Sequence, residues 1–173
     1  QGSVALACAW SGIAAVLLEG GRTCHSRFGL PVPMPREDVT SSIIAQSARA
    51  DVLRQARLIL WDEAPMAPRE VLECVDMLLR DLLQNDMSFG GKVLVLGGDF
   101  RQVLPVMPHC AREDIVGHSI KSHGLWIDGL VTVFSGYKHA CTMIRRVAQI
   151  LAQCGGRGRT YMRRSESFRH SSA

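Results

Sequence analysis

Short runs of apolar residues recur along the chain, and longer segments with helical spacing separate them. The runs contain almost no alternating polar positions, which is typical of strands buried on both faces. They cover residues 3–9, 58–61, 92–96 and 130–134. Strands that alternate with helices at this spacing predict an α/β fold with a parallel sheet.

The helix predicted over residues 71–85 has the most regular pattern in the chain. Its apolar residues follow the i, i+3, i+4, i+7 spacing that places them on one helical face, with charged residues such as Asp76 off that face. The apolar residues are Val71, Leu72, Val75, Leu78, Leu79, Leu82 and Leu83.

Three weaker helices are predicted over residues 13–18, 47–57 and 113–122. Ser11 is the predicted N-cap of the first, because a serine hydroxyl accepts from a free amide of the first turn. The second has an inward stripe of Ala48, Val52, Leu53 and Ala56. Residues 22–28 are polar and mixed, and no regular element is predicted there.

Polar side chains follow two of the predicted strands at the point where each strand ends. Asp62 and Glu63 come directly after the apolar run at residues 58–61, and Asp99, Arg101 and Gln102 follow the run at residues 92–96. Parallel strands end at the same edge of a sheet, where ligands bind in open α/β folds. The sequence therefore predicts that the two polar groups converge.

The adjacent carboxylates of Asp62 and Glu63 are the central candidate for chemistry. One can orient a metal ion while the other orients or deprotonates a water molecule. The alternative is a solvated pair that begins the next helix, where negative charge suits the N-terminus. The convergence with Gln102 favours the chemical interpretation, whereas Trp61 is expected to serve packing.

The net charge of +4 is unevenly distributed over the 173 residues. Residues 137–173 carry +7 and are rich in arginine and serine, whereas the remaining residues carry −3. We therefore expect one domain over residues 1–136 and a basic, disordered tail over residues 137–173. The positive balance says nothing about nucleic-acid binding by the domain itself.

Cysteine and histidine usage predicts neither a disulfide framework nor a zinc site. The six cysteines include no Cys-x-x-Cys pair, and the spacing of His109, Cys110, His118 and His123 matches no common ligand pattern. No apolar run has the roughly 20 residues of a membrane span, so no membrane association is expected. The chain starts at Gln1, without an initiator methionine, and a fragment is expected.

An acidic pair after a buried strand is the Walker-B arrangement of P-loop nucleotide triphosphatases. Three ordered segments in this chain resemble successive motifs of the PIF-type (petite integration frequency) DNA helicases, and most of all the group associated with Helitron transposons. The resemblance covers roughly residues 3–134, and Phe89–Lys92 and Leu125–Trp126 also match. The three segments are residues 20–28, 59–66 and 97–106.

The resemblance implies an incomplete RecA-like (P-loop NTPase) motor domain of a superfamily-one ATPase. Such enzymes translocate 5′ to 3′ on single-stranded DNA in repair, recombination and telomere maintenance. It also implies ATP as the substrate, Mg²⁺ as the cofactor, and residence in the nucleus, with the mitochondrion as the alternative. Protein partners remain unassigned.

The resemblance also assigns roles to individual residues. Asp62 would hold magnesium, Glu63 would act as the catalytic base, and Gln102 would sense the γ-phosphate; all three would contribute to the nucleotide site. The residues implied to line the DNA strand are Ser11, Gly12, Thr23, His25, Phe100 and Pro105. For Thr23 and His25 a hydrogen-bond network within the loop is the alternative, and Phe100 and Pro105 equally suit a core and a turn.

The 173 residues contain no Gly-x-x-x-x-Gly-Lys-Ser/Thr pattern, the loop that cradles phosphates. Gly90–Lys92 is too short and precedes a strand, and Arg145–Arg146 only weakly matches the family's arginine motif. In the family the phosphate loop lies upstream of the position of Gln1. The alternative function is therefore a catalytically inactive remnant that binds nucleic acid or a partner weakly, and we expect no ATP hydrolysis by the isolated chain.

Overall fold

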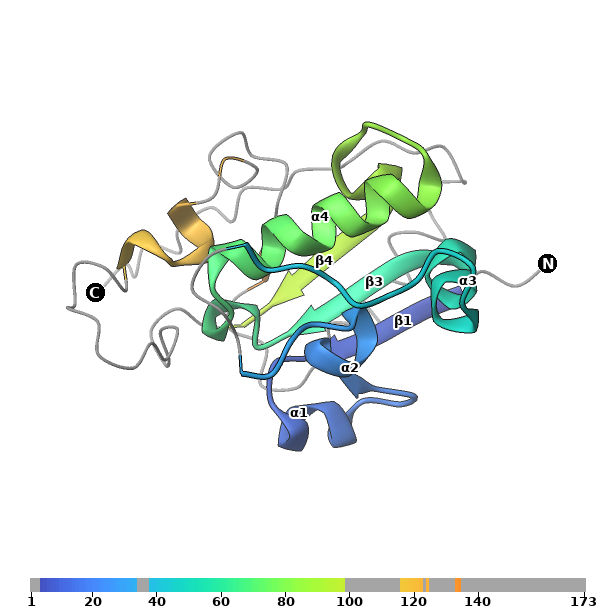
Figure 1. The fold of residues 1–173 in the computed structure, drawn as a ribbon. Coiled ribbons are helices and arrows are strands. Elements are labelled where there is room, and N and C mark those ends of the chain that lie inside the picture. Colours follow the sequence, from blue (N-terminus) through green and yellow to red (C-terminus); the bar gives the residue numbers. More distant parts are fainter. Residues whose placement is uncertain (1–3, 34–37, 99–115, 123, 125–132, 135–173) are drawn as a thin grey trace, which may run out of the picture.

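The computed structural model describes residues 4–33, 38–98, 116–122, 124 and 133–134. In this part of the chain the strands form one sheet with the order β2-β1-β3-β4-β5, and every neighbouring pair is parallel (Figure 1). The strands are β1 (Val4–Ala9), β2 (Arg22–Thr23), β3 (Ala56–Asp62), β4 (Val93–Gly97) and β5 (Val133–Phe134). The predicted parallel α/β sheet is confirmed.

β3 lies at the centre of the sheet because nearly all of its side chains are apolar. Leu58, Ile59, Leu60 and Trp61 are all buried, so both faces of this strand are covered. The register pairs Leu60 with Ala7 of β1 on one side and with Val95 of β4 on the other. The run predicted as a doubly covered strand is thus the strand that positions the acidic pair.

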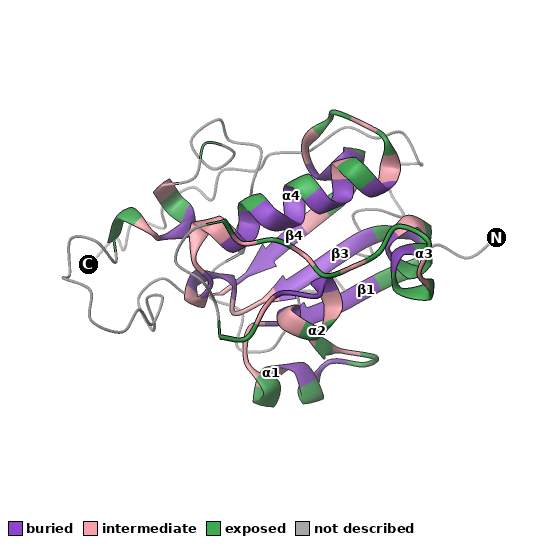
Figure 2. Ribbon diagram, viewed as in Figure 1, coloured by how far each residue is buried: buried purple, intermediate pink, exposed green. Residues whose placement is uncertain are grey.

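Helices cover the two faces of the sheet unequally. The buried side chains of α2 (Cys24–Phe28), α3 (Ala48–Gln55) and α4 (Arg69–Leu83) join one core cluster with alternate residues of β1 and β3. The opposite face of β1 contacts α1 (Gly12–Leu17) through a smaller cluster of Ala7, Ala9, Ala15 and Leu18. Figure 2 shows the continuous buried stripe of α4 where it faces the sheet.

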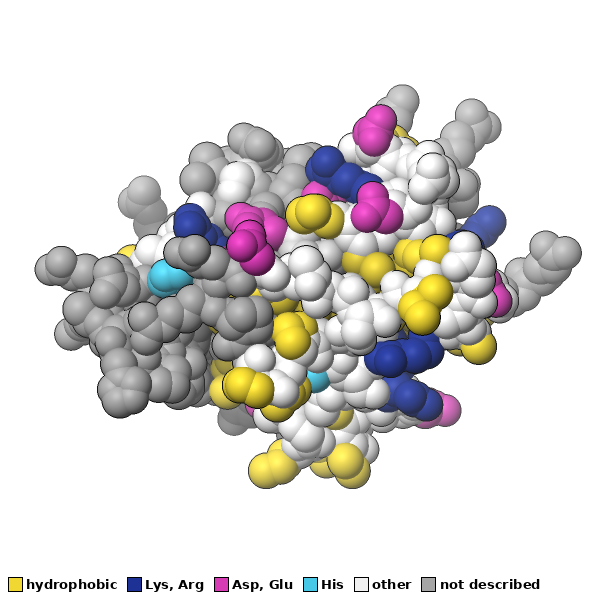
Figure 3. Space-filling view, viewed as in Figure 1, with side chains coloured by type: hydrophobic (Ala, Val, Ile, Leu, Met, Phe, Trp, Pro, Cys, Tyr) yellow, Lys and Arg dark blue, Asp and Glu magenta, His cyan; other side chains and the backbone are white. Residues whose placement is uncertain are grey.

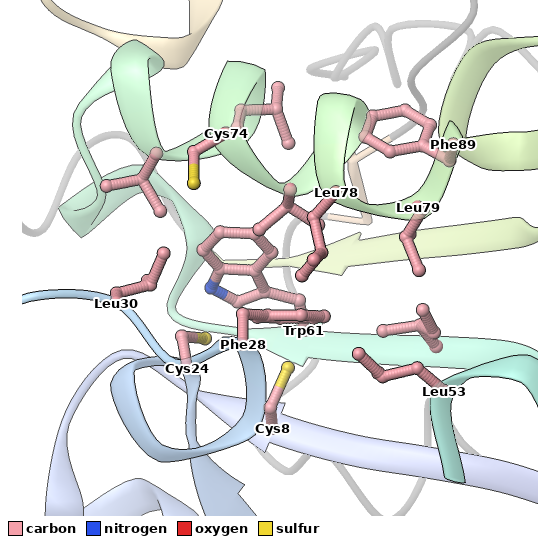
Figure 4. Packing of buried hydrophobic residues seen from close by; sticks show 14 of the residues in the cluster. Cys8, Cys24, Phe28, Leu30, Leu53, Trp61, Cys74, Leu78, Leu79 and Phe89 are labelled. Atoms are coloured by element: carbon pink, nitrogen blue, oxygen red, sulfur yellow. The ribbon is translucent and has the colours of Figure 1, made fainter. Parts of the chain in front are cut away.

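Trp61 is the largest side chain at the centre of the main cluster. It is 1% exposed, and its ring lies 5.8 Å from the ring of Phe28 (centroid to centroid). Figure 4 shows the indole between the side chains of α4, such as Leu78, and those of α2. The expected packing role of Trp61 is confirmed.

Two details of the helices differ from the sequence prediction. Asp76 of α4 is buried, although its position places it beside the apolar stripe, because its Oδ1 accepts the backbone amide of Phe89 and its Oδ2 pairs with Arg80 at 2.9 Å. The predicted stripe of residues 47–57 is wrong in part, since Ala50 and Leu53 face the core while Val52 is 41% exposed. Ala56 and Arg57 belong to β3 because the chain is already extended there.

The polar segment at residues 22–28 forms β2 and the short helix α2, neither of which was predicted. Arg27 stabilises this arrangement, because its guanidinium donates to the carbonyls of Ala7 and Gly20 at 3.1 and 3.0 Å. Three short segments complete the described elements: the 3₁₀ turns η1 (Ala64–Met66) and η3 (Ile120–Ser122), and η2 (Ser88–Gly91), in which Phe89 and Gly90 are left-handed. Among the described residues, no helix has both the length and the apolar character to cross a membrane.

Candidate functional site

The carboxyl edge of the sheet brings together residues from the ends of four strands. The register places Thr23 beside Ala9, Ala9 beside Asp62, and the preceding Trp61 beside Leu96 of β4. The ends of β2, β1, β3 and β4 therefore lie in one row. The predicted convergence is confirmed for the strands, whereas Asp99, Arg101 and Gln102 lie outside the described residues.

Asp62 is the last residue of β3, and its carboxylate is half-buried at this edge. Its Oδ1 accepts the backbone amide of Glu63 at 2.9 Å. Burial raises the pKa of Asp62, the negative charge of Glu63 adds to the rise, and the hydrogen bond from the Glu63 amide opposes it. Burial removes part of the water that stabilises the charged carboxylate, and a nearby cation would stabilise that charge instead. The Asp62 side chain therefore suits a metal ion.

Glu63 leaves the strand in a left-handed conformation, with φ 55° and ψ 30°. Few non-glycine residues adopt this region, and those that do are often found at functional sites. The turn directs the Glu63 side chain across the sheet edge, where its Oε2 accepts the backbone amide of Ser11 at 3.0 Å. Glu63 is thus linked directly to a segment 52 residues earlier in the chain.

Ser11 and Gly12 begin α1 immediately after β1. The Ser11 hydroxyl accepts the amide of Ala14 at 3.2 Å, which confirms the predicted N-cap. A side chain at Gly12 would meet nothing within 4 Å of its Cβ in the described structure. Packing in the described residues therefore does not require glycine at this position, which leaves room for a ligand to approach the backbone.

Thr23 and His25 occupy the junction between β2 and α2. The Thr23 hydroxyl accepts the amide of Ser26 at 3.2 Å and caps α2, so the loop network considered as the alternative exists for this residue. The His25 ring lies 4.7 Å from the ring of Trp10 (centroid to centroid), and burial lowers the pKa of His25. Their role in DNA binding stays a prediction.

Trp10 is a residue of the site that the sequence did not single out. Its backbone amide donates to the carbonyl of Asp62 at 3.2 Å, and its half-buried ring contacts His25. Trp10 therefore joins the acidic pair to the segment that carries Thr23 and His25. The only signal in the sequence was an aromatic residue directly before Ser11–Gly12 at the end of a strand.

Gly98 follows β4 directly and packs against the turn that comes after the acidic pair. A Cβ at Gly98 would lie 2.3 Å from Cδ of Pro65, and the residue has φ +149°, so other residues are strained there. This contact holds the end of β4 against the turn after Glu63. The predicted site residues Gln102, Phe100 and Pro105 follow directly and lie outside the described residues.

Lys92 lies at the opposite edge of the sheet from Asp62, immediately before β4. Its Nζ donates to the carbonyls of Arg54, at 3.0 Å, and Ala56, and burial lowers its pKa. The amine is therefore committed to the amino ends of the strands, which agrees with the conclusion that Gly90–Lys92 does not serve as a phosphate loop.

Groups of three or more potential ligands for a metal do not occur among the residues that the structure describes. His118 contacts a carboxylate instead, with Nδ1 2.5 Å from Oε1 of Glu70. His109, Cys110 and His123 lie outside the described part. A magnesium site remains compatible with this structure, because Mg²⁺ is commonly held by one or two carboxylates together with substrate phosphates and water.

A parallel sheet with an acidic pair after a central buried strand fits an incomplete RecA-like α/β domain. The model of the PIF1-like helicase family matches residues 1–143, and the chain belongs to this family. The three motifs identified in the sequence all fall within the matched residues.

Relatives in sequence and structure agree with this assignment. The chain is 35% identical over 105 residues to the ATP-dependent DNA helicase Pif1 of Bdellovibrio bacteriovorus and 33% identical over 97 residues to the ATP-dependent DNA helicase RRM3 of Saccharomyces cerevisiae. These matches cover 60% and 56% of this chain, and 24% and 13% of the relatives. The chain thus spans about a quarter or less of either relative.

A solved structure of a Pif1 helicase from Bacteroides in complex with ADP-AlF3 and ssDNA superposes with a TM-score of 0.63 at 26% identity. The match covers 79% of this chain and 33% of that one. A structure of two Pif1 helicases at forked dsDNA matches with a TM-score of 0.60. The fold described above is therefore that of part of a Pif1 motor domain, an incomplete RecA-like α/β domain.

Proposed function

We propose that this chain forms part of the first motor domain of an ATP-dependent DNA helicase that translocates 5′ to 3′ on single-stranded DNA. The observation that carries the proposal is the row of Thr23, Ala9 and Asp62 at one sheet edge, with Glu63 bonded to Ser11. Residues assigned to nucleotide chemistry and to the DNA strand are thereby adjacent. The Bacteroides relative, which binds ADP-AlF3 and ssDNA, supports the same pairing of ligands.

Each residue has a defined part in this proposal. Asp62 would hold Mg²⁺, which neutralises charge on the ATP phosphates, and the half-buried state of its carboxylate supports this role. Glu63 would take the proton of the attacking water, and Gln102 would contact the γ-phosphate. The DNA strand would run past Ser11, Gly12, Thr23, His25, Phe100 and Pro105, where hydroxyls and backbone amides can bind phosphates.

The biological setting that we propose is the one of the family: repair, recombination and telomere maintenance in the nucleus, with the mitochondrion as the alternative compartment. The second candidate is a catalytically inactive remnant that binds nucleic acid or a partner weakly. Its support is the lack of a Gly-x-x-x-x-Gly-Lys-Ser/Thr pattern in these 173 residues, together with the commitment of Lys92 to backbone carbonyls.

ATP hydrolysis with and without single-stranded DNA separates the two candidates. We expect residues 1–173 alone to show no turnover above background, and the full-length protein that contains them to show DNA-stimulated turnover. Glu63→Gln should lower that turnover by about 10²–10⁴-fold, because a general base contributes this much. Glu19→Gln changes an exposed glutamate beyond α1 and serves as the matched control.

Turnover by the full-length protein that Glu63→Gln leaves intact would contradict the assigned role of Glu63. Absence of turnover in the full-length protein, with or without DNA, would favour the inactive candidate. Sequencing the transcript upstream of the codon for Gln1 gives independent information: a Gly-Lys-Thr loop encoded there supports the enzyme, and stop codons support the remnant.

A further inference from the structure

Two consecutive backbone amides at the end of β1 hold the two consecutive acidic residues at the end of β3. The Trp10 amide donates to the backbone carbonyl of Asp62 at 3.2 Å. The Ser11 amide donates to the side chain of Glu63, at 3.0 Å from Oε2. The first bond continues the strand pairing, whereas the second engages the carboxylate to which we assign the chemistry.

The conformation of Glu63 explains how its side chain reaches Ser11. Asp62 accepts the amide of Glu63 on its own Oδ1, and the chain then turns into η1 through the left-handed conformation of Glu63. The carboxylate is thereby directed across the sheet edge toward β1. A residue held in a sparsely populated conformation by several surrounding contacts is typical of functional sites.

The bond to Ser11 resembles one half of a capping box. In a capping box, the glutamate at the third helical position accepts the amide of the N-cap residue. That third position in α1 is Ala14, which has no acceptor in its side chain, and Glu63 supplies the acceptor from another strand. The N-cap amide of α1 is thus satisfied by the proposed catalytic base and by no residue of its own helix.

We propose that the Ser11 amide is a positioning group that holds the Glu63 carboxylate, and that nucleic acid bound along Ser11–Gly12 releases it. A phosphate oxygen of the strand can accept the same amide, so phosphate and Glu63 compete for one donor. Once released, Glu63 is able to accept a hydrogen bond from water at the nucleotide. This inference rests on the proposed function. It makes the hydrogen bond between the Ser11 amide and Glu63 the direct link between DNA binding and ATP hydrolysis.

The connection extends to the second segment assigned to the DNA strand. Trp10, the neighbour of Ser11, contacts the ring of His25, the second residue of α2. A strand that displaces His25 or Trp10 therefore acts on the same backbone that carries the Ser11 amide. Both DNA-lining segments converge on Glu63 through Trp10 and Ser11.

Replacement of Ser11 by proline removes the amide hydrogen while the backbone conformation is retained. Ser11 has φ −89° and ψ 155°, close to the φ that proline imposes. Ser11→Gly loses the same hydroxyl but keeps the amide, and glycine is accepted at N-caps. The comparison of Ser11→Pro with Ser11→Gly therefore isolates the hydrogen bond to Glu63.

Ser47 provides a control for proline at an N-cap. It caps α3 with nearly the same geometry, φ −86° and ψ 154°, and its hydroxyl accepts the amide of Ala50. In the full-length protein we expect Ser11→Pro to raise the DNA-free kcat for ATP about tenfold above Ser11→Gly, a change of ~1.4 kcal/mol in activation free energy. The KM for ATP should not separate these two variants, and Ser47→Pro should leave the rate unchanged.

A second measurement does not depend on turnover. Hydrogen exchange of the Ser11 amide, followed by NMR, reports whether Glu63 protects it. Glu63→Ala should accelerate this exchange severalfold in the DNA-free protein, and the exchange rate of the Phe28 amide, which lies within α2, is the internal reference.

The outcomes separate the inference from the function on which it rests. Equal DNA-free rates for Ser11→Pro and Ser11→Gly, in an enzyme that DNA still stimulates, would overturn the positioning role alone. Unchanged exchange of the Ser11 amide in Glu63→Ala would do the same. Absence of any hydrolysis that depends on Glu63 would overturn the proposed function and the positioning role together.

Discussion

α4 and α1 pack on opposite faces of the same sheet, but different forces hold them. α4 points its large apolar side chains at the sheet, and Val71, Leu72, Val75 and Leu79 are at most 1% exposed. α1 does the reverse: Ala15 faces the sheet, while Ile13, Val16 and Leu17 are 82%, 85% and 73% exposed. Figure 3 shows hydrophobic side chains on the surface at the bottom of the view, where α1 lies.

The difference shows which parts of the domain serve stability and which serve the site. α4 is fixed by burial of apolar area, the main favourable contribution to folding. α1 is held by the small cluster of Ala7, Ala9, Ala15 and Leu18 together with polar contacts at its first turn, namely the Ser11 cap and the bond from Ser11 to Glu63. We therefore infer that α4 tolerates little change in its core face, whereas α1 can move without loss of the main core.

The largest expected change in the free energy of unfolding comes from truncation of a core side chain of α4. Leu79→Ala should lower the free energy of unfolding by about 2–5 kcal/mol, because it removes buried methyl groups and leaves a cavity. Ile13→Ala, the matched truncation on α1, should change it by about 0.5 kcal/mol or less. Urea denaturation followed by circular dichroism measures both. Similar losses for the two variants would contradict the contrast between the helices.

An intermediate effect is expected for the buried acid of α4. Asp76→Ala should cost about 1–3 kcal/mol, because it leaves the Phe89 amide and the Arg80 guanidinium without their acceptor. Asp76→Asn should recover part of the loss, since the amide oxygen can still accept from Phe89. Asp81→Ala, on the exposed side of the same helix, is the control in thermal or urea unfolding. A neutral Asp76→Ala would show that packing alone fixes α4.

The smallest expected effect is a gain in stability instead of a loss, and it concerns Asp62 at the candidate site. Burial raises the pKa of Asp62, so the folded state binds this proton more tightly than the unfolded state. Its contribution to stability is therefore most favourable below the ordinary carboxyl pKa and declines as the pH rises through the raised pKa. Asp62→Asn removes the buried charge and keeps an acceptor for the Glu63 amide.

We accordingly expect Asp62→Asn to unfold at a slightly higher urea concentration than the unmodified protein at about pH 7, and the difference to vanish near about pH 3. Asp81→Asn sets the baseline for removal of one exposed carboxylate. A gain that is identical at both pH values would assign the effect to something other than the charge of Asp62.

The sequence was sufficient for elements that are determined by their own residues. The run at residues 58–61 predicts a strand covered on both faces, and burial of Leu58 to Trp61 confirms it. The periodicity of Val71 to Leu83 predicts α4 because all of its partners lie on one side. The parallel order of the strands also predicts that β3 and β4 end at one edge, and the register confirms it.

Elements that depend on distant partners were not predictable. β2 has two residues and exists because it pairs with Cys8 and Ala9 of β1, and α2 depends on the Thr23 cap. Asp76 looked like a surface residue because its acceptor role depends on the turn at Phe89. Asp62 and Glu63 were identified from their type and position, but the bond from Ser11 and the participation of Trp10 follow only from the paired strands.

The contact between Gly98 and Pro65 has a consequence for how this surface changes during evolution. The ring of Pro65, in the turn after β3, packs directly on the backbone of Gly98, after β4, and leaves no room for a Cβ at position 98. A larger residue at position 98 requires a smaller one at position 65, together with a new backbone conformation. We therefore expect substitutions at positions 65 and 98 to be coupled, because the residue at either position limits the space available to the other.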